Sequence, residues 1–166
     1  TWYIGGILSN LESFVHEGTL VVTGRMVSDV YVKPGATLAG NGTVARELAV
    51  FGTVAPGLSI GALDAGCLSL NPGCVYQWEV DANNTTADVI RVGSVLELPD
   101  LAPNSVTVKV VQVGAGGIVN LPAFTFEWLA GDTNALVVDT SGTGFLQPSV
   151  VFSDSAITIT MVPEPA

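Results

Sequence analysis

Three carboxylates are the residues of this chain best placed to do chemistry. Glu79 and Asp81 lie two residues apart in a stretch that alternates polar and apolar side chains, and Asp88 follows a short polar loop. The alternation predicts a strand with both acids on its wet face. Two carboxyl groups ~5–9 Å apart can serve as the acid and base of a glycosidase, and carboxylates with loop carbonyls can bind calcium. A solvated strand face explains the pattern without a ligand, so Glu79, Asp81 and Asp88 are only weak calcium candidates, and we expect no other cofactor.

Other catalytic chemistries lack their residues. The one histidine, His16, lies in an irregular stretch beside Glu12 and Glu17, and a Ser-His-Asp triad needs that imidazole held against its nucleophile. One histidine and two cysteines fall short of the three or four ligands of a zinc site. The glycines at 114–117 lack the Lys-Ser/Thr pair of a phosphate-binding loop. We therefore predict that the protein is not an enzyme.

The elements that must position these residues are short and punctuated by glycine. Gly18, Gly35 and Gly52 recur at one constant interval, and the phrase Gly-Thr-Leu/Val recurs at 18–20, 42–44 and 52–54. A chain that turns, lays down a few apolar or Thr residues and turns again winds into coils, whose inner faces are buried only by stacked neighbours. The pattern predicts an all-β fold with a short right-handed parallel β-solenoid over residues 18–98.

Both flanks of this segment have a different pattern. Residues 1–17 are expected to form an N-terminal extension or cap, with 9–17 either a helical turn or irregular. From residue 99 the rhythm is lost and longer strands are predicted, such as 106–113 and 156–162. Residues 99–166 are therefore expected to form a sheet or sandwich-like cap over the solenoid, within one continuous domain.

Composition excludes two classes of partner. Fifteen acids face five scattered bases, for a net charge of −10, so no patch exists to neutralise a phosphate backbone and nucleic-acid binding is excluded. No apolar run reaches the ~18 residues of a membrane-spanning helix. Yet only 12% of residues are charged and the mean hydropathy is +0.53. This scarcity of charge predicts that some apolar surface is buried against copies of the same chain.

Two segments resemble exported bacterial proteins. The glycine phrases at 38–44 and 52–61, followed by 68–70, 76–81 and 88–90, resemble the autotransporter-associated β-strand repeat of passenger and surface proteins. The final Val162–Ala166, with Pro163, Glu164 and Pro165, resembles the start of a PEP-CTERM sorting signal, although the apolar helix and basic cluster of that family do not follow. The resemblance implies secretion to the cell surface or extracellular matrix of a Gram-negative-type bacterium. It supplies no catalytic residues.

The two cysteines flank a corner of the predicted winding. Cys67 and Cys74 stand on either side of Asn-Pro-Gly at 71–73, where two strands could bring their Cα atoms within the ~4.4–6.8 Å of a disulfide. An exported location would let such a bond persist. We predict the disulfide, with two buried thiols packing as small hydrophobes as the alternative.

These observations together predict a non-catalytic extracellular structural protein that assembles with itself. Strand edges at the two ends of the chain would join copies into a filament, fibre or surface layer. The self-association candidates are Trp2, Tyr3, Ile4, Ile157, Ile159 and Met161. The alternative is a secreted polysaccharide-binding or adhesin-like module, whose stacking platforms would be Tyr31, Tyr76, Trp78 and Trp128, although core packing explains these aromatic positions as well.

Overall fold

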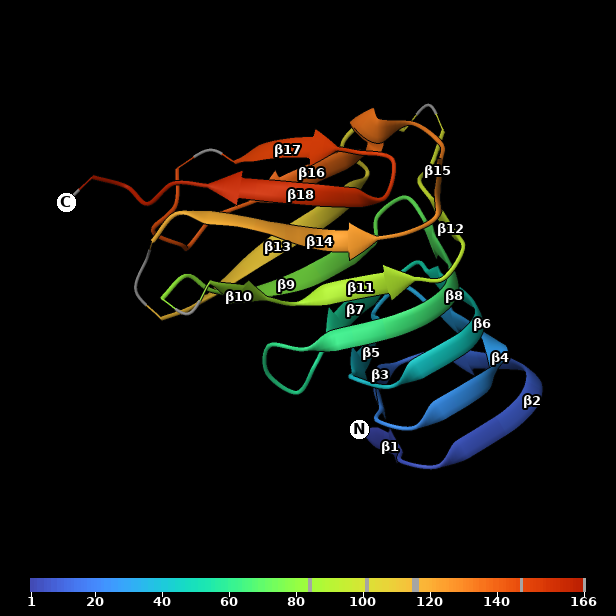
Figure 1. The fold of residues 1–166 in the computed structure, drawn as a ribbon. Coiled ribbons are helices and arrows are strands. Elements are labelled where there is room, and N and C mark those ends of the chain that lie inside the picture. The colour runs from blue at the N-terminus through green and yellow to red at the C-terminus, as the bar shows by residue number, and fades with distance from the viewer. Residues whose placement is uncertain (84, 101, 115–116, 147, 166) are drawn as a thin grey trace.

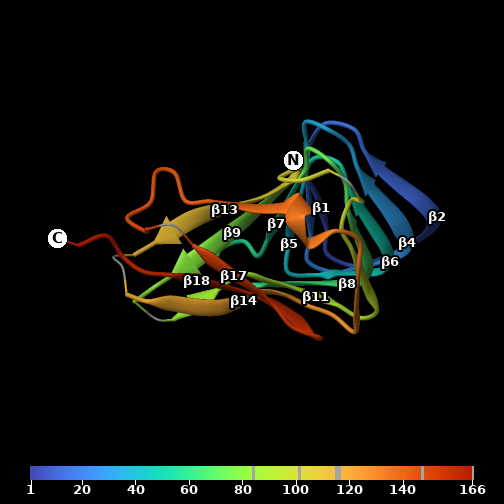
Figure 2. The ribbon, with the colours of Figure 1, turned by 90° about the horizontal axis from the view of Figure 1, so that it is seen from above.

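The computed structural model describes residues 1–83, 85–100, 102–114, 117–146 and 148–165, and these form two layered sheets (Figure 1 and Figure 2). Sheet A has the order β1 (Trp2–Ile4), β3 (Gly18–Val22), β5 (Ala36–Gly40), β7 (Thr53–Pro56), β9 (Val75–Asp81), β13 (Val106–Val113) and β16 (Leu136–Asp139). Sheet B has the order β2 (Ile7–Val15), β4 (Arg25–Val32), β6 (Thr43–Val50), β8 (Ala62–Leu70), β11 (Val89–Val92), β14 (Val119–Thr125), β18 (Ala156–Met161) and β17 (Ser149–Phe152). Three short strands lie beside these paths: β10 (Thr86–Ala87), β12 (Val95–Glu97) and β15 (Trp128–Ala130).

Over its first half, the chain alternates between the two sheets. Each strand from β3 to β9 lies parallel to the strand two places earlier, so that Leu20 is in register with Leu38, and Leu38 with Val54. Parallel neighbours of this kind need a crossover, and here the crossover is the strand in the opposite sheet. The predicted all-β class is therefore confirmed, with mainly parallel sheets.

The core is the space between the sheets, and the alternation of side chains fills it. In β4, every second residue from Met26 to Val32 is buried, as expected for strands with one face inward. Register places the inward residues of successive strands in columns. One column of sheet B contains Val30, Leu48, Leu68 and Leu96, all fully buried.

The glycine spacing reflects these columns. The sequence separation between Trp2 and Leu20 equals that between Leu20 and Leu38, and both are slightly longer than the separation of the turn glycines Gly18, Gly35 and Gly52. The separation between Leu38 and Val54 is slightly shorter than that of the glycines. Gly35 precedes β5 with φ 84°, a conformation that residues with a Cβ rarely adopt. The turn glycines thus set where each strand begins.

The expected boundary at residue 17 is absent from the structure. β1 pairs in parallel with β3, and β2 pairs in parallel with β4 from Ile7 to Val15. Residues 9–17, for which we expected a helical turn or an irregular segment, are mostly strand. The N-terminal residues are the first members of the repeating pattern, and the prediction of an extension or cap was wrong.

The C-terminal residues extend the same two sheets rather than forming a separate cap. β13 and β16 add to sheet A in parallel, and β14 adds to sheet B in parallel with β11. β18 is then antiparallel to β14, and β17 is antiparallel to β18. The one helix in the described part of the chain is the 3-10 turn η1 (Thr133–Ala135), so no helix there is long enough to cross a membrane.

Candidate assembly interface

The N-terminal end of both sheets carries unpaired backbone. β1 is the last strand of sheet A and β2 the last strand of sheet B in the described residues. The Ile4 carbonyl accepts from Thr23 N at 2.9 Å and so faces β3. Because successive peptide groups of a strand alternate in direction, the N–H and C=O of Tyr3 face outward.

The edge of β2 is exposed in the same way. The Gly6 carbonyl accepts from Arg25 N at 2.9 Å. By the same alternation, the backbone N–H and C=O of Leu8 face β4, and those of Ile7 and Ser9 face the free edge. The register of β2 with β4 shifts between Ser9 and Glu12, so the regular part of this free edge is Ile7–Ser9.

The same end leaves inward side chains uncovered. Trp2 belongs to the column that continues through Leu20 and Leu38, yet 77% of Trp2 is exposed whereas Leu38 is fully buried. Leu8 is in register with Met26, which is fully buried, and is itself 38% exposed. The core is therefore open to solvent at the end of the two sheets formed by β1 and β2, and one more strand in each sheet would cover it.

A depression of about 330 Å³ marks this opening. Its lining consists of the apolar residues Trp2, Phe14, Val15 and Leu20 together with His16 and Glu17. His16 is exposed and its ring stacks on Phe14 with centroids 5.9 Å apart. The depression offers an apolar surface to an incoming chain and sets no serine beside the imidazole.

An aromatic cluster holds β2 against β4. The rings of Phe14 and Tyr31 stack at 5.0 Å and 15°. Lys33 Nζ lies 5.4, 5.7 and 5.3 Å from the ring centroids of Phe14, Tyr31 and Phe51. Exposed cation–π contacts contribute ~0.5–1 kcal/mol each, so this cluster stabilises the packing of Phe14, near the end of β2, against β4.

Half of the predicted self-association residues lie at this end. Trp2 and Tyr3 are 77% and 72% exposed, and Ile4 is half-buried. The other half were wrong, because β18 lies between β14 and β17 and its inward side chains fill the core. The fully buried residues are Ile157, Ile159 and Met161.

Sequence reasoning missed the apolar residues of β2. Ile7, Leu11 and Phe14 are 78%, 81% and 47% exposed. A signal was available in the spacing, since Leu8 precedes Met26 by the same interval that separates Met26 from Val44. Continuing that interval backward would have identified β2 as a strand.

The three carboxylates do not converge on a site. Asp88 is fully buried, and its Oδ1 and Oδ2 accept hydrogen bonds from Gly61 N at 2.8 Å and Glu79 N at 3.0 Å. Asp81 Oδ1 instead accepts from Asn83 N at 3.0 Å. Among the described residues no group of three or more His, Cys, Asp or Glu is arranged to hold a metal ion. Asp88 is a structural carboxylate that ties β9 to the loop before β8.

Burial controls the protonation of Asp88. The pKa of this carboxyl is raised to about 7, mainly by desolvation and to a smaller extent by the nearby Glu79 carboxylate, while the two backbone N–H donors lower the pKa and offset part of the rise. A buried carboxylate is costly without such donors, which explains why Gly61 and Glu79 point their N–H groups at it.

Two of the predicted sugar platforms lie in the core instead. Tyr76 and Trp78 are fully buried. Tyr76 Oη donates to the Ala123 carbonyl at 3.2 Å, and Trp78 Nε1 donates to the Asp88 carbonyl at 2.7 Å. The first hydrogen bond links β9 of sheet A to β14 of sheet B, and the second links β9 to the residue before β11 of sheet B. These two aromatic side chains therefore join the two sheets.

Trp128 is the most exposed of the four predicted platforms, at 70%. It lines a depression of about 600 Å³ with Phe152 from β17 and with Glu127, Ser153 and Asp154. An indole face beside carboxylates offers stacking and hydrogen-bond acceptors together. Tyr31, by contrast, is half-buried within the aromatic cluster.

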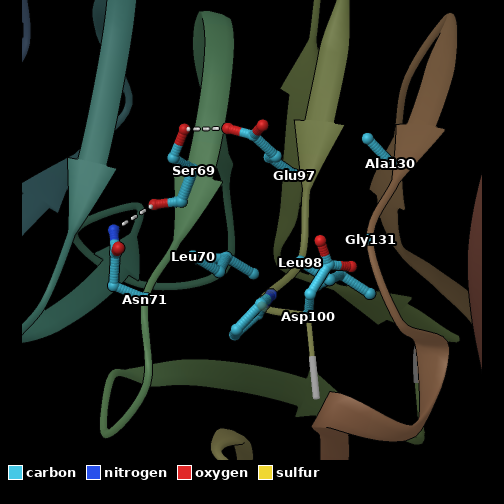
Figure 3. A pocket seen from close by; sticks show the side chains of 9 residues that line it. Ser69, Leu70, Asn71, Glu97, Leu98, Asp100, Ala130 and Gly131 are labelled. Carbon is cyan, nitrogen blue, oxygen red and sulfur yellow. Dashed lines mark hydrogen bonds between the residues drawn. The ribbon is translucent and has the colours of Figure 1, made fainter. Parts of the chain in front are cut away.

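A smaller pocket of about 290 Å³ lies at the C-terminal ends of β8, β12 and β15 (Figure 3). Ser69 of β8 and Glu97 of β12 face each other there, and Asp100 and Asn71 complete its polar lining. Ser69 Oγ lies 3.0 Å from Glu97 Oε2 and also 3.0 Å from Glu47 Oε1. The Ser69 hydroxyl has a single proton and can donate it to only one of these two carboxylates at a time. The lining of the pocket contains no aromatic ring on which a sugar could stack.

The predicted disulfide is not formed, and both cysteines are free. Cys67 is half-exposed on β8, where it is in register with Glu47, whereas Cys74 is fully buried in the core. One thiol therefore lies at the surface of sheet B while the other faces inward ahead of β9. Burial raises the pKa of the Cys74 thiol to about 12, so it behaves as the small hydrophobe of our alternative.

The tail that resembles a sorting motif is held against the chain. Glu164 N donates to the Gly144 carbonyl at 2.8 Å, and Pro163 forms a bridge with Phe145. Pro165 follows within the described residues. These contacts fix Pro163 and Glu164 beside the loop that joins β16 to β17.

Comparison with known proteins gives one short match. No family model matches the chain. A stretch of 53 residues is 43% identical to part of an extracellular serine protease of Serratia marcescens. The match covers 31% of this chain and 5% of the length of that protein.

Proposed function

We propose that this chain is a non-catalytic extracellular structural protein, wound as a right-handed parallel β-solenoid, whose copies associate through their strand edges. The observation that carries the proposal is the 77% exposure of Trp2 in a column where Leu20 is half-buried and Leu38 is fully buried. Burying a large apolar side chain contributes ~1.5–3 kcal/mol. Another strand layer over Trp2 and Leu8 would supply that burial.

The character of the edges supports association. β1 is Trp-Tyr-Ile and the regular edge of β2 is Ile-Leu-Ser, with no charge and no proline. Soluble proteins commonly block free strand edges with lysine, proline or a covering segment. Uncharged edges that expose aromatic side chains are the kind that pair with another chain.

Export is part of the proposal. It is supported by the terminal Pro163, Glu164 and Pro165 and by the short match to an extracellular protein. The acidic composition, with a net charge of −10, is consistent with a protein that meets neither nucleic acid nor an anionic membrane surface.

Sedimentation velocity over a wide range of protein concentration tests the association. The weight-average sedimentation coefficient should rise with concentration and should fall toward the monomer value in Trp2→Ser. Leu58→Ser is the matched control, since it removes a similarly exposed apolar side chain from the loop between β7 and β8, away from the strand edges, and should leave association intact. A wild-type chain that stays monomeric at every concentration would remove the basis for this function.

A second candidate function is favoured by Trp128. Its exposed indole, with Glu127 and Asp154 on the rim of the depression, offers a stacking surface and acceptors for the hydroxyl groups of a neutral polysaccharide. Affinity electrophoresis in gels containing neutral polysaccharides tests this function. Retardation should be lost in Trp128→Ala and kept in Trp2→Ala; equal mobility with and without polysaccharide would exclude it.

A further inference from the structure

We infer that copies of this chain associate head to tail, with β1 and β2 of one copy extending the two sheets at β16 and β17 of the next. This inference rests on the proposed self-association and adds the surface that receives the N-terminal end. The edges at both ends of the two sheets carry the argument (Figure 1).

Strand direction matches between the two ends. In sheet A every pairing along the path from β1 to β16 is parallel. In sheet B the pairings are parallel from β2 to β14, and two antiparallel steps then lead through β18 to β17. Two reversals restore the original direction. β16 therefore runs parallel to β1, and β17 runs parallel to β2.

This match lets a copy stack without being turned over. A second copy, displaced along the stacking direction, would place its β1 against β16 and its β2 against β17, both as parallel neighbours. The lengths also suit pairing, since β1 has three residues against four in β16, and the regular edge of β2 at 7–9 faces the four residues of β17. A single junction would continue both sheets, with the incoming copy tilted because the path of sheet B has one strand more than that of sheet A.

The backbone of β17 is free to pair. Ser153 N donates to the Ala156 carbonyl at 2.9 Å, so Ser153 faces β18. Alternation then turns the N–H groups of Val150 and Phe152 toward the outer edge. Like β1 and the regular edge of β2 at residues 7–9, β17 contains no charged residue and no proline.

The side chains at the C-terminal end complement those at the N-terminal end. The column that begins with Trp2 ends at Val138 of β16, which is half-buried. Val150 and Phe152 of β17 are also half-buried against the core. Head-to-tail stacking would set Trp2 over Val138, and Leu8 over the inner face of β17. Each end would cover the other's incomplete core.

The competing arrangement is a two-fold dimer through two N-terminal ends. It would pair β1 with β1 and β2 with β2 in antiparallel fashion, bury Trp2 against its own copy, and leave β16 and β17 unpaired. Such an interface closes at two copies, whereas the head-to-tail interface is open and continues indefinitely. Head-to-tail pairing is favoured because it accounts for both incomplete ends.

Edge-blocked variants distinguish the two arrangements. Tyr3→Pro with Ser9→Pro removes outward N–H groups from the N-terminal edge, and Val150→Pro removes one from β17. Head-to-tail association predicts that each variant alone is monomeric at concentrations where wild type assembles. Mixed together, they should form a 1:1 complex that grows no further. Tyr3→Val with Ser9→Ala, and Val150→Ala, keep every N–H group and should assemble as wild type does.

Each outcome has a distinct meaning. If Val150→Pro forms a dimer alone and the mixture adds nothing, the head-to-tail inference is overturned while self-association stands. If wild type itself stays monomeric, the proposed function fails and the inference with it. Circular dichroism checks that each variant is folded. Should Val150→Pro not fold, Val151→Arg replaces it, because Val151 is 55% exposed on the same strand and a charged edge opposes pairing.

Discussion

Trp2 and Leu38 stand in one inward-facing column of sheet A, two strands apart, yet Trp2 is 77% exposed and Leu38 is fully buried. The difference comes from position in the stack, because Leu38 has strands on both sides and Trp2 has one on its inner side only. Identical register with opposite burial is the mark of an unfinished core.

This relationship predicts different costs for two similar truncations. Leu38→Ala should lower the free energy of unfolding by ~2–5 kcal/mol, because it leaves a cavity between strands. Trp2→Ala should change the stability of the dilute monomer by no more than ~0.5 kcal/mol, while weakening association. Urea denaturation at low protein concentration measures both, and a large loss for Trp2→Ala in the monomer would show that Trp2 is already packed.

The buried carboxyl of Asp88 predicts a pH dependence of stability. Its pKa is raised to about 7 from an ordinary value of 3.8, so between these values the native state holds a proton that the unfolded chain releases. The free energy of unfolding should therefore fall as the pH rises through this window, and this contribution should be flat above it. Below about pH 3.8, where both states are protonated, the contribution is fully present.

Urea denaturation across that range checks the sign. Asp88→Asn should remove this part of the slope, because an amide does not titrate in this range. Asp154→Asn, an exposed acid on the turn between β17 and β18, is the control and should keep the wild-type slope. Identical slopes for wild type and Asp88→Asn would contradict the assignment.

The free cysteines predict unequal reactivity. Cys67 is half-exposed, and Cys74 is buried with its pKa raised to about 12. Because the thiolate is the reactive form, a thiol reagent should modify one cysteine in the folded protein and both in denaturant, without prior reduction. Cys67→Ser should abolish the reaction of the folded protein. Failure to titrate any thiol in denaturant until a reductant is added would reveal a disulfide.

The hydroxyl of Tyr76 predicts a modest contribution to stability. It donates to the Ala123 carbonyl at 3.2 Å from a fully buried position, and such a bond contributes ~0.5–1.5 kcal/mol. Tyr76→Phe should lower the unfolding free energy by about that amount, whereas Tyr3→Phe, at a position that is 72% exposed, should leave the monomer unchanged. Equal effects of the two changes would indicate that the buried bond is not formed.

Local patterning predicted much of the architecture. The strict alternation from Val75 to Asp81 is seen in β9, whose Tyr76, Trp78 and Val80 are buried. The glycine turns correctly indicated short strands that return at a nearly constant interval. What the pattern could not give was which terminal strand lies at an edge, because that depends on pairing between residues far apart in the chain. For this reason Ile157 looked like an edge residue and proved to be core.

The candidate site was predicted only in part for a related reason. Trp2 and Tyr3 were identified from their apolar character, but Leu8 and Phe14 were not, since Asn10 and Glu12 interrupt the apolar pattern at the register shift of β2. The cysteines and Asp88 were misjudged because burial and the facing of a side chain follow from tertiary packing. Spacing alone does not contain that information.

Electron microscopy of the assembled protein tests the central claim most directly. Sheet A has seven strands on its path and sheet B eight in the described residues, so head-to-tail stacking at ~4.8 Å per strand predicts filaments one molecule wide. Their power spectrum should show a ~4.8 Å meridional spacing and a subunit rise of ~34–38 Å. Dispersed monomers at high concentration, or an ordered assembly whose strands do not run across its axis, would contradict the account.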